Sequence, residues 1–222
     1  MIYYPINLDI RNKSCLVVGG GGVGTRKVKG LIECGAIVTL ISPDAGKTLI
    51  ELAEAGKIGW KQRFYQSSDL DGVFLVIGAT DNDALNRQIQ SDARQLNILC
   101  NIADSPELCD FIVPSTIRRG DLVISISTSG KSPASAKFIR KELEKQFDSQ
   151  YGVFLHLMGS IRKQLLAESH APQTHKALFE RLIEKGLLQS VKTGQIREID
   201  SLLLEVLGKG YTFESLMKTD GG

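Results

Sequence analysis

The chain has 222 residues, of which 42% are hydrophobic and 23% are charged. This length is enough to bury a sizeable core, so one compact domain with an additional region is the first expectation. The formal net charge of +2 is too small to predict a nucleic-acid partner. No window supplies the roughly 18 apolar residues that cross a bilayer, and the N-terminus lacks the apolar run of a signal peptide, so we expect a cytoplasmic protein without a membrane partner.

The cysteines and histidines fit no metal motif. The four cysteines are Cys15, Cys34, Cys100 and Cys109. They form no C-x-x-C pair, and scattered thiols in a reducing compartment are most simply small core residues. The three histidines are His156, His170 and His175. Their spacing favours surface or packing roles, so we expect neither a disulfide nor a metal site.

The first half of the chain alternates short apolar runs with amphipathic segments. A strand at 14–18 is apolar throughout, a helix follows the glycines and ends near Gly35, and a second strand covers 36–41. Further elements are expected as a helix at 44–55, strands near 58–62 and 73–79, a helix near 83–96 and a strand at 98–103. Apolar strands alternating with helices predict a Rossmann-type, doubly wound parallel sheet over residues 1–113.

The stretch VVGGGGVGTRK places a glycine pattern between the first strand and the first helix. Gly19, Gly21 and Gly24 fit G-x-G-x-x-G, the spacing of a dinucleotide-binding turn. In that context Gly19 allows a tight turn, Gly21 lets the backbone approach a pyrophosphate, and Gly24 permits close packing of helix on strand. Gly22 and Val23 would supply amides at the helix start. The alternative is a glycine-rich loop without a ligand.

Other candidate cofactor contacts lie where the next strands end, because ligands of such sheets bind beyond the carboxyl ends of the strands. They are Pro43, Asp44, Thr80 and Asp81. The acid that binds the ribose usually ends the second strand, but this chain has Ser42 there. Asp44 is the nearest carboxylate, and we expect NAD as the cofactor. Asp44 could equally be a residue at the helix start, favoured by the helix dipole.

Asp104 stands just past the fifth strand, in the sequence NIADSP. A carboxylate at that edge could act as a general base. It could equally be a turn residue that bonds its own backbone, which is common for Asp before Ser-Pro. Asp110 is the rival carboxylate, but it directly precedes the apolar run FIVP.

Basic residues gather around the middle of the chain. Residues 111–163 carry nine Lys or Arg against four Asp or Glu. Charge runs are usually solvated faces. Arg26 and Lys27, however, lie near a helix start, where the dipole disfavours cations unless an anion is close. Together with Arg118 and Lys131 they could line a pocket for a ligand with several carboxylates.

The second half changes rhythm around Pro114. A strand at 121–128 and an amphipathic helix after it predict a small α+β region over 114–149. From Tyr151 the apolar positions fall at helical spacing, with further helices near 174–188 and 195–207. We therefore expect a helical domain over 150–222.

Four motifs in order carry a resemblance to a known family. VVGGGGVGTRKV, GATDND, NIADSPELCDFIVPS and ISTSGKSPASAKFIRKELE resemble the precorrin-2 dehydrogenase and sirohydrochlorin ferrochelatase family of sirohaem biosynthesis. The resemblance implies NAD-dependent oxidation of precorrin-2 to sirohydrochlorin, in some members followed by insertion of Fe²⁺. Precorrin-2 is a polycarboxylate, and its negative charges would complement those of the basic residues.

The resemblance also implies roles for single residues. Asp104 matches the essential aspartate of the family, and Thr128 and Ser129 occupy its substrate-side serine-rich loop. Members are homodimers, and residues 114–147 correspond to their dimerisation region. Relatives often have alanine at Gly24, which implies that alanine is tolerated there. No methyltransferase domain follows, so we expect the stand-alone enzyme; the alternative is a non-catalytic module that senses NAD or NADH.

Overall fold

A five-stranded parallel sheet forms the centre of the N-terminal half, with the strand order β3-β2-β1-β4-β5. The strands are β1 (Ser14–Gly20), β2 (Ile37–Ala45), β3 (Gly59–Lys61), β4 (Leu75–Gly78) and β5 (Leu99–Ile102). β1 occupies the middle because its side chains are apolar on both faces: Leu16, Val17 and Val18 are at most 3% exposed. The predicted Rossmann-type sheet is confirmed.

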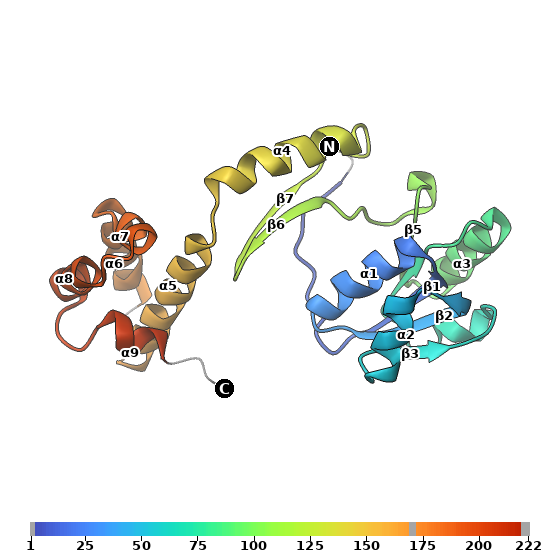
Figure 1. The fold of residues 1–222 in the computed structure, drawn as a ribbon, viewed down its shortest axis with the longest axis horizontal. Helices are drawn as coiled ribbons and strands as arrows, with labels where there is room; N and C mark the ends of the chain where they lie inside the picture. Colours follow the sequence, from blue (N-terminus) through green and yellow to red (C-terminus); the bar gives the residue numbers. More distant parts are fainter. Residues whose placement is uncertain (1–2, 169–171, 219–222) are drawn as a thin grey trace. The chain divides into compact units, whose positions relative to one another are not determined.

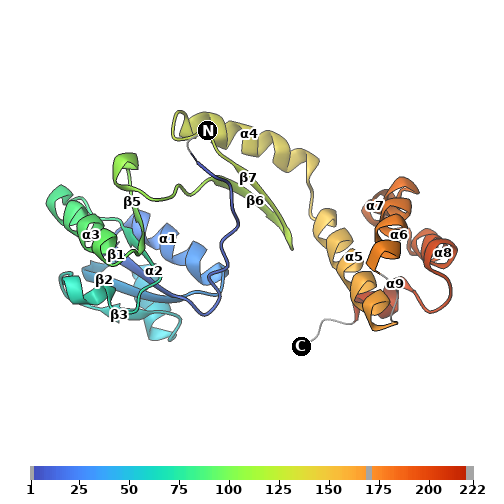
Figure 2. The ribbon, with the colours of Figure 1, turned by 180° about the vertical axis from the view of Figure 1, so that it is seen from behind.

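Helices cover both faces of this sheet (Figure 1, and from behind in Figure 2). α1 (Gly22–Glu33) and α2 (Lys47–Glu54) bury Val28 and Leu49 on one face. α3 (Asp83–Gln95) buries Ile89 on the other. Because the chain runs from β1 to β2 on one side and reaches β4 on the other, the loops after β1 and β4 diverge and leave a crevice at the carboxyl edge.

The computed structural model describes residues 3–168 and 172–218. The chain divides into two compact units, Met1–Val113 and Pro114–Gly222. A further boundary near residue 150 stays a prediction. Among the described residues, no helix has the length and apolar character needed to cross a membrane.

The second unit begins with an antiparallel pair, β6 (Ser115–Arg119) and β7 (Leu122–Ile126). The helices that follow are α4 (Pro133–Gln146), α5 (Gln150–Ala167), α6 (Pro172–Glu184), α7 (Leu187–Thr193), α8 (Ile196–Leu207) and α9 (Phe213–Met217). Helices α5 to α9 share one apolar core that includes Leu157, Leu182 and Leu203. The predicted strand, amphipathic helix and helical tail are all present.

Two element boundaries differ from the sequence prediction for a visible physical reason. β2 continues to Ala45 rather than ending at residue 41, because Ala45 pairs with Gly20 of β1. The expected single helix at 174–188 is two helices, since Gly186 takes a left-handed backbone with φ of +85° between α6 and α7.

Two of the four cysteines lie in the core, where scattered thiols were expected. Cys15 and Cys100 are buried in the sheet, and burial raises the pKa of each thiol, to about 11 and about 12 respectively. His175 is buried and His156 is half-buried in the second unit, whereas His170 lies outside the described residues. Within 3–168 and 172–218, no three His, Cys, Asp or Glu side chains gather as a metal site would require.

Candidate functional site

The glycine turn between β1 and α1 is tight for a reason specific to each glycine. Gly19 has a φ of +113°, and a Cβ there would overlap the carbonyl oxygen of Ala79 in the loop after β4. A Cβ on Gly24 would overlap the carbonyl oxygen of Gly19, so α1 packs directly against the turn. The expectation that alanine fits at Gly24 is therefore wrong for this geometry, because backbone would have to move.

Gly21 and Gly22, by contrast, face open space. A Cβ on Gly21 or Gly22 would meet nothing within 4 Å. Gly21 is the N-cap of the 12-residue helix α1, no side chain caps its amides, and the first turn carries no acidic residue. Unpaired amides at a helix N-terminus attract anions, so this end of α1 suits a pyrophosphate.

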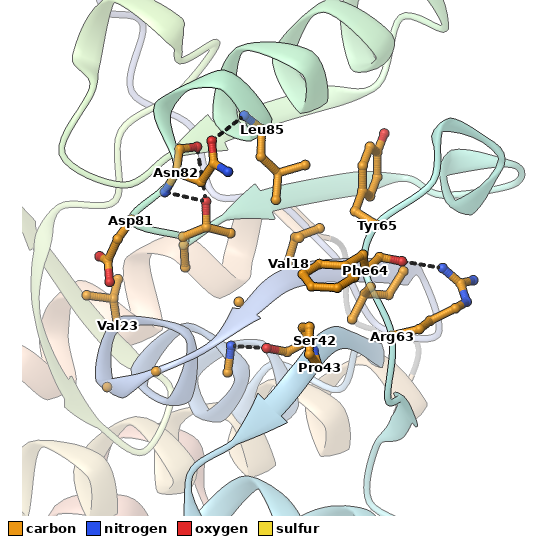
Figure 3. A pocket seen from close by; sticks show the side chains of 17 residues that line it. Val18, Val23, Ser42, Pro43, Arg63, Phe64, Tyr65, Asp81, Asn82 and Leu85 are labelled. Carbon is orange, nitrogen blue, oxygen red and sulfur yellow. Dashed lines mark hydrogen bonds between the residues drawn. The ribbon is translucent and has the colours of Figure 1, made fainter.

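A cavity of about 560 Å³ opens at this point of the sheet edge (Figure 3). Of the predicted cofactor contacts, those that line it are Gly19, Gly21, Gly22, Val23, Pro43, Thr80 and Asp81. Gly24 lies behind the turn, and Asp44 is exposed at the end of β2 without lining the cavity. The lining residues that were not predicted include Arg63, Phe64 and Tyr65 from the segment after β3, and Asn82 and Leu85 at the start of α3.

Ser42, which stands where dinucleotide-binding sheets usually carry an acid, ties the turn to β2. Its side chain is buried, and its Oγ accepts a hydrogen bond from the Gly20 amide at 3.0 Å, as Figure 3 shows. Its carbonyl oxygen accepts one from Trp60 Nε1 at 3.1 Å. Ser42 therefore lines the cavity and links the glycine turn to β2 and β3.

The segment after β3 reaches the cavity because Asp69 holds it. The Asp69 carboxylate is 2% exposed and accepts from Arg63 Nη1 at 2.7 Å, from Lys61 Nζ at 3.2 Å and from the Gln66 amide at 2.9 Å. The bond from Arg63 is the main cause that lowers the pKa of Asp69 to about 2, and the Gln66 and Lys61 bonds add to it against the opposing effect of burial. A buried carboxylate thus fixes the backbone that carries Phe64.

We expect Asp69 to make the free energy of unfolding depend on pH in the acidic range. The pKa of Asp69 is lower in the folded chain, about 2, than its ordinary 3.8. Its contribution, about 2 kcal/mol, is therefore present above the unfolded pKa and lost as the pH falls through the folded one. Urea unfolding of the wild type and of Asp69→Asn from about pH 6 down to about pH 2 checks this. The difference in unfolding free energy between the wild type and Asp69→Asn should shrink as the pH falls. A difference that stays constant with pH would contradict this role of Asp69.

Asp104 lies in the loop that follows β5, and its carboxylate is exposed. Its backbone is left-handed, with a φ of +60°, a conformation that costs about 1 kcal/mol or more and persists only where the surrounding structure enforces it. Asp110, the rival carboxylate, accepts from the Cys100 amide at 2.9 Å, and its own amide donates to the Cys100 carbonyl. Asp110 therefore closes the base of the loop, which makes Asp104 the better candidate of these two carboxylates for a general base.

Arg26 and Lys27 are neighbours in the sequence, but their side chains lie in different environments. Since α1 begins at Gly22, both fall in its second turn. Arg26 is exposed, whereas Lys27 is half-buried and its Nζ donates to Asn101 Oδ1 at 3.2 Å. Burial lowers the pKa of Lys27, with Cys109 and Asp104 opposing that effect and Arg26 adding to it.

Three of the predicted substrate contacts of the second unit, Thr128, Ser129 and Lys131, lie at the turn before α4. Thr128 Oγ1 donates to the Ser132 carbonyl at 3.1 Å and accepts from its amide at 3.2 Å. Ser129 is left-handed, with a φ of +52°, and the Lys131 amide donates to the Thr128 carbonyl. Arg118 is exposed on β6. The candidate residues thus form two sets, one in each unit.

Comparison with known proteins gives consistent findings for both units. Residues 6–115 match an NAD(P)-binding family model, and residues 119–146 match the family model described as the central part of a sirohaem biosynthesis protein. A solved structure titled "SirC, precorrin-2 dehydrogenase" is 26% identical, covers 92% of this chain and 99% of its own, and superposes with a TM-score of 0.77.

Curated relatives extend beyond the matched region. The siroheme synthase of Vesicomyosocius okutanii is 37% identical over 198 residues, which are 89% of this chain and 42% of the relative. The siroheme synthase of Methylococcus capsulatus is 34% identical over 205 residues, which are 92% of this chain and 43% of the relative. The chain thus spans less than half the length of these two relatives.

Proposed function

Because the chain belongs to the family of precorrin-2 dehydrogenases and sirohaem synthase N-terminal regions, we propose that it oxidises precorrin-2 to sirohydrochlorin with a nicotinamide dinucleotide. One observation carries the proposal. The open glycine turn and the Asp104 loop lie on the same carboxyl edge of one sheet, after β1 and after β5. A dinucleotide with its pyrophosphate at α1 and its adenosine toward β2 and β3 would extend its other half toward β4 and β5.

The cavity supports NAD over NADP. Recognition of a 2′-phosphate needs a cation that is available to it. Arg63 is the cation among the described residues that line the cavity, and Asp69 already binds it through two hydrogen bonds. The exposed Asp44 at the end of β2 remains a candidate for the ribose hydroxyls.

The mechanism assigns the chain a positioning role and one proton transfer. Gly21, Gly22 and Val23 at the start of α1 would hold the dinucleotide, which would supply a hydride acceptor for the oxidation of the macrocycle. Asp104 would accept the proton lost from the adjacent position and release it to water, so that the macrocycle loses two hydrogens in all. Arg26, Arg118, Thr128, Ser129 and Lys131 would bind the substrate's carboxylates.

The test is anaerobic formation of NADH from NAD⁺ and precorrin-2 by the purified chain. Stoichiometric NADH and sirohydrochlorin support the proposal. Binding of NAD⁺ without turnover, under conditions in which a characterised dehydrogenase consumes the same substrate, favours the alternative of a sensing module.

Phe64 gives a prediction about the adenosine half of the cofactor. Its side chain is 77% exposed yet lines the cavity, and Figure 3 shows its ring extending over it. An aromatic ring placed so can stack on a purine, so Phe64→Ala should weaken NAD⁺ binding about tenfold, the equivalent of about 1.4 kcal/mol. Calorimetric titration measures this, and the control is Tyr4→Ala, which removes an exposed aromatic side chain that does not line the cavity. Unchanged affinity of Phe64→Ala would exclude the stacking role.

A second copy of the chain is the proposed partner. A two-stranded sheet on its own is marginal in water. β6 and β7 form a two-stranded sheet on which α4 packs, and these three elements leave Val123, Phe138 and Ile139 exposed at 44%, 66% and 41%. Burying this surface against its copy gives a homodimer through residues 114–149. Sedimentation equilibrium at micromolar concentration should give twice the chain mass; a monomer mass would contradict it.

Insertion of Fe²⁺ into sirohydrochlorin, like the cytoplasmic location, stays a prediction. Such a step treats the metal as a substrate and needs a base to remove the pyrrole protons. Anaerobic incubation of sirohydrochlorin and Fe²⁺ with and without the chain tests it, and equal rates reject it.

A further inference from the structure

The surroundings of Lys27 indicate a role different from the substrate binding that its charge suggested. This inference rests on the proposed function. We propose that Lys27 is a positioning residue, which, together with Asn101 and Cys109, holds the loop that carries Asp104. The sequence placed Lys27 among the contacts to substrate carboxylates. The geometry instead directs its ammonium group toward the protein interior.

Asn101 is the centre of this arrangement. It lies on β5, is 6% exposed, and uses both ends of its amide. Oδ1 accepts from Lys27 Nζ at 3.2 Å, and Nδ2 donates to the Phe111 carbonyl at 2.9 Å. A single buried side chain therefore joins α1, β5 and the segment that returns from the Asp104 loop.

Cys109 completes the closure at the other side of the loop. Its Sγ accepts from the Ile102 amide at 3.2 Å and lies 3.2 Å from the Ile102 carbonyl and 3.3 Å from the Ser105 carbonyl. Asn101 Nδ2 lies 3.4 Å from the same sulfur. The residues on both sides of Asp104 are thus bonded to one another, and this bonding can hold its left-handed backbone.

Charge supports the same role. Lys27 is half-buried, and the charged or titratable groups that act on it are Cys109, Arg26 and Asp104. Burying a cation without a partner is costly, so the Asn101 oxygen and the nearby carboxylate stabilise Lys27 where it is. Arg26, on the same helix turn but exposed, remains available to a ligand.

The two roles predict different kinetics. A residue that binds substrate carboxylates mainly changes KM when removed, whereas one that aligns a reacting group mainly changes kcat. For Lys27→Met we therefore expect kcat for NADH formation to fall about tenfold, with KM for precorrin-2 and Kd for NAD⁺ changed less than about threefold. Lys27→Arg, which keeps a donor for Asn101, should recover most of that loss.

Two further variants sharpen the test. Lys29→Met removes the same charge from an exposed position of α1 and should leave all three constants unchanged. Asn101→Ala removes the bond to the Phe111 carbonyl as well, so it should lower kcat at least as much as Lys27→Met does. The double variant should have a kcat close to that of Asn101→Ala, because the bond between Lys27 and Asn101 is already lost in that variant.

The outcomes distinguish failure of the proposed function from failure of the role proposed for Lys27. If the wild type makes no NADH, the proposed function fails, whatever the variants do. If the wild type turns over, a raised KM with unchanged kcat in Lys27→Met returns Lys27 to substrate binding and overturns the inference. Independent, multiplying losses in the double variant also overturn it. Should Lys27→Met fail to bind NAD⁺, Lys27→Gln is compared with Lys29→Gln by the same criteria.

Discussion

Asp104→Asn should lower kcat for NADH formation by on the order of 10²–10⁴ while changing Kd for NAD⁺ less than about twofold. Asparagine is the sharpest substitution because, like aspartate, it tolerates a left-handed backbone, and Asp104 has a φ of +60°. The loop then keeps its course, and only the capacity to accept a proton is lost. Single-turnover measurement of NADH formation with excess enzyme, together with titration of NAD⁺, checks both parts.

Glu107→Gln is the matched control for Asp104→Asn. Glu107 is an exposed carboxylate of the same loop. Neutralising it should leave kcat within about twofold of the wild type. Equal rates for the wild type and Asp104→Asn would remove Asp104 from the mechanism, and a large loss in Glu107→Gln would show that loop charge matters more than the position of one carboxylate.

Gly24→Ala is the second change with a large expected effect. Its new Cβ would overlap the Gly19 carbonyl oxygen, and the Gly19 carbonyl carbon would lie at 3.1 Å. Because both atoms are backbone, α1 must shift away from the turn. We expect the free energy of unfolding to fall by about 3 kcal/mol and NAD⁺ affinity to fall at least about tenfold, since the helix N-terminus moves with the helix. Urea unfolding and NAD⁺ titration measure the two effects.

The same helix provides a control with the opposite sign. Gly30 is exposed, and a Cβ there would meet nothing within 4 Å. Gly30→Ala should therefore raise the free energy of unfolding by about 1 kcal/mol, because alanine loses less backbone freedom in a helix. If Gly24→Ala behaves like Gly30→Ala, the close packing of α1 on the glycine turn is not what requires glycine.

The fold was predictable where the chain is strongly patterned. β1, β4 and β5 are apolar runs, and the glycine turn lies between a strand and a helix, so period and spacing identify them. β6 was not predicted, because its sequence STIRR contains no apolar run; Ile117 is its one buried residue. α7 was missed because the sequence analysis placed its first two residues in the helix expected at 174–188 and residues 189–193 in no element. Gly186 and Gly194, both left-handed, limit α7 to seven residues.

The candidate site was predictable along one side of the cavity. The residues after β1, β2 and β4 follow from the rule that ligands bind at the carboxyl edge. Phe64 does not follow from it, because β3 has only three residues and the segment after it takes its course from Asp69. The inward direction of Lys27 likewise depends on Asn101, which is 74 residues away in the sequence. Contacts between distant positions leave no periodic signal.

Cys109 has a practical consequence for work on this chain. Burial raises the pKa of its thiol above the ordinary value of 9.0, so the sulfur keeps its hydrogen near neutral pH. Electrophiles and peroxides react with thiolates, and a sulfur that stays protonated is a slow target for both. Alkylating reagents and air are therefore expected to modify Cys109 slowly during an assay.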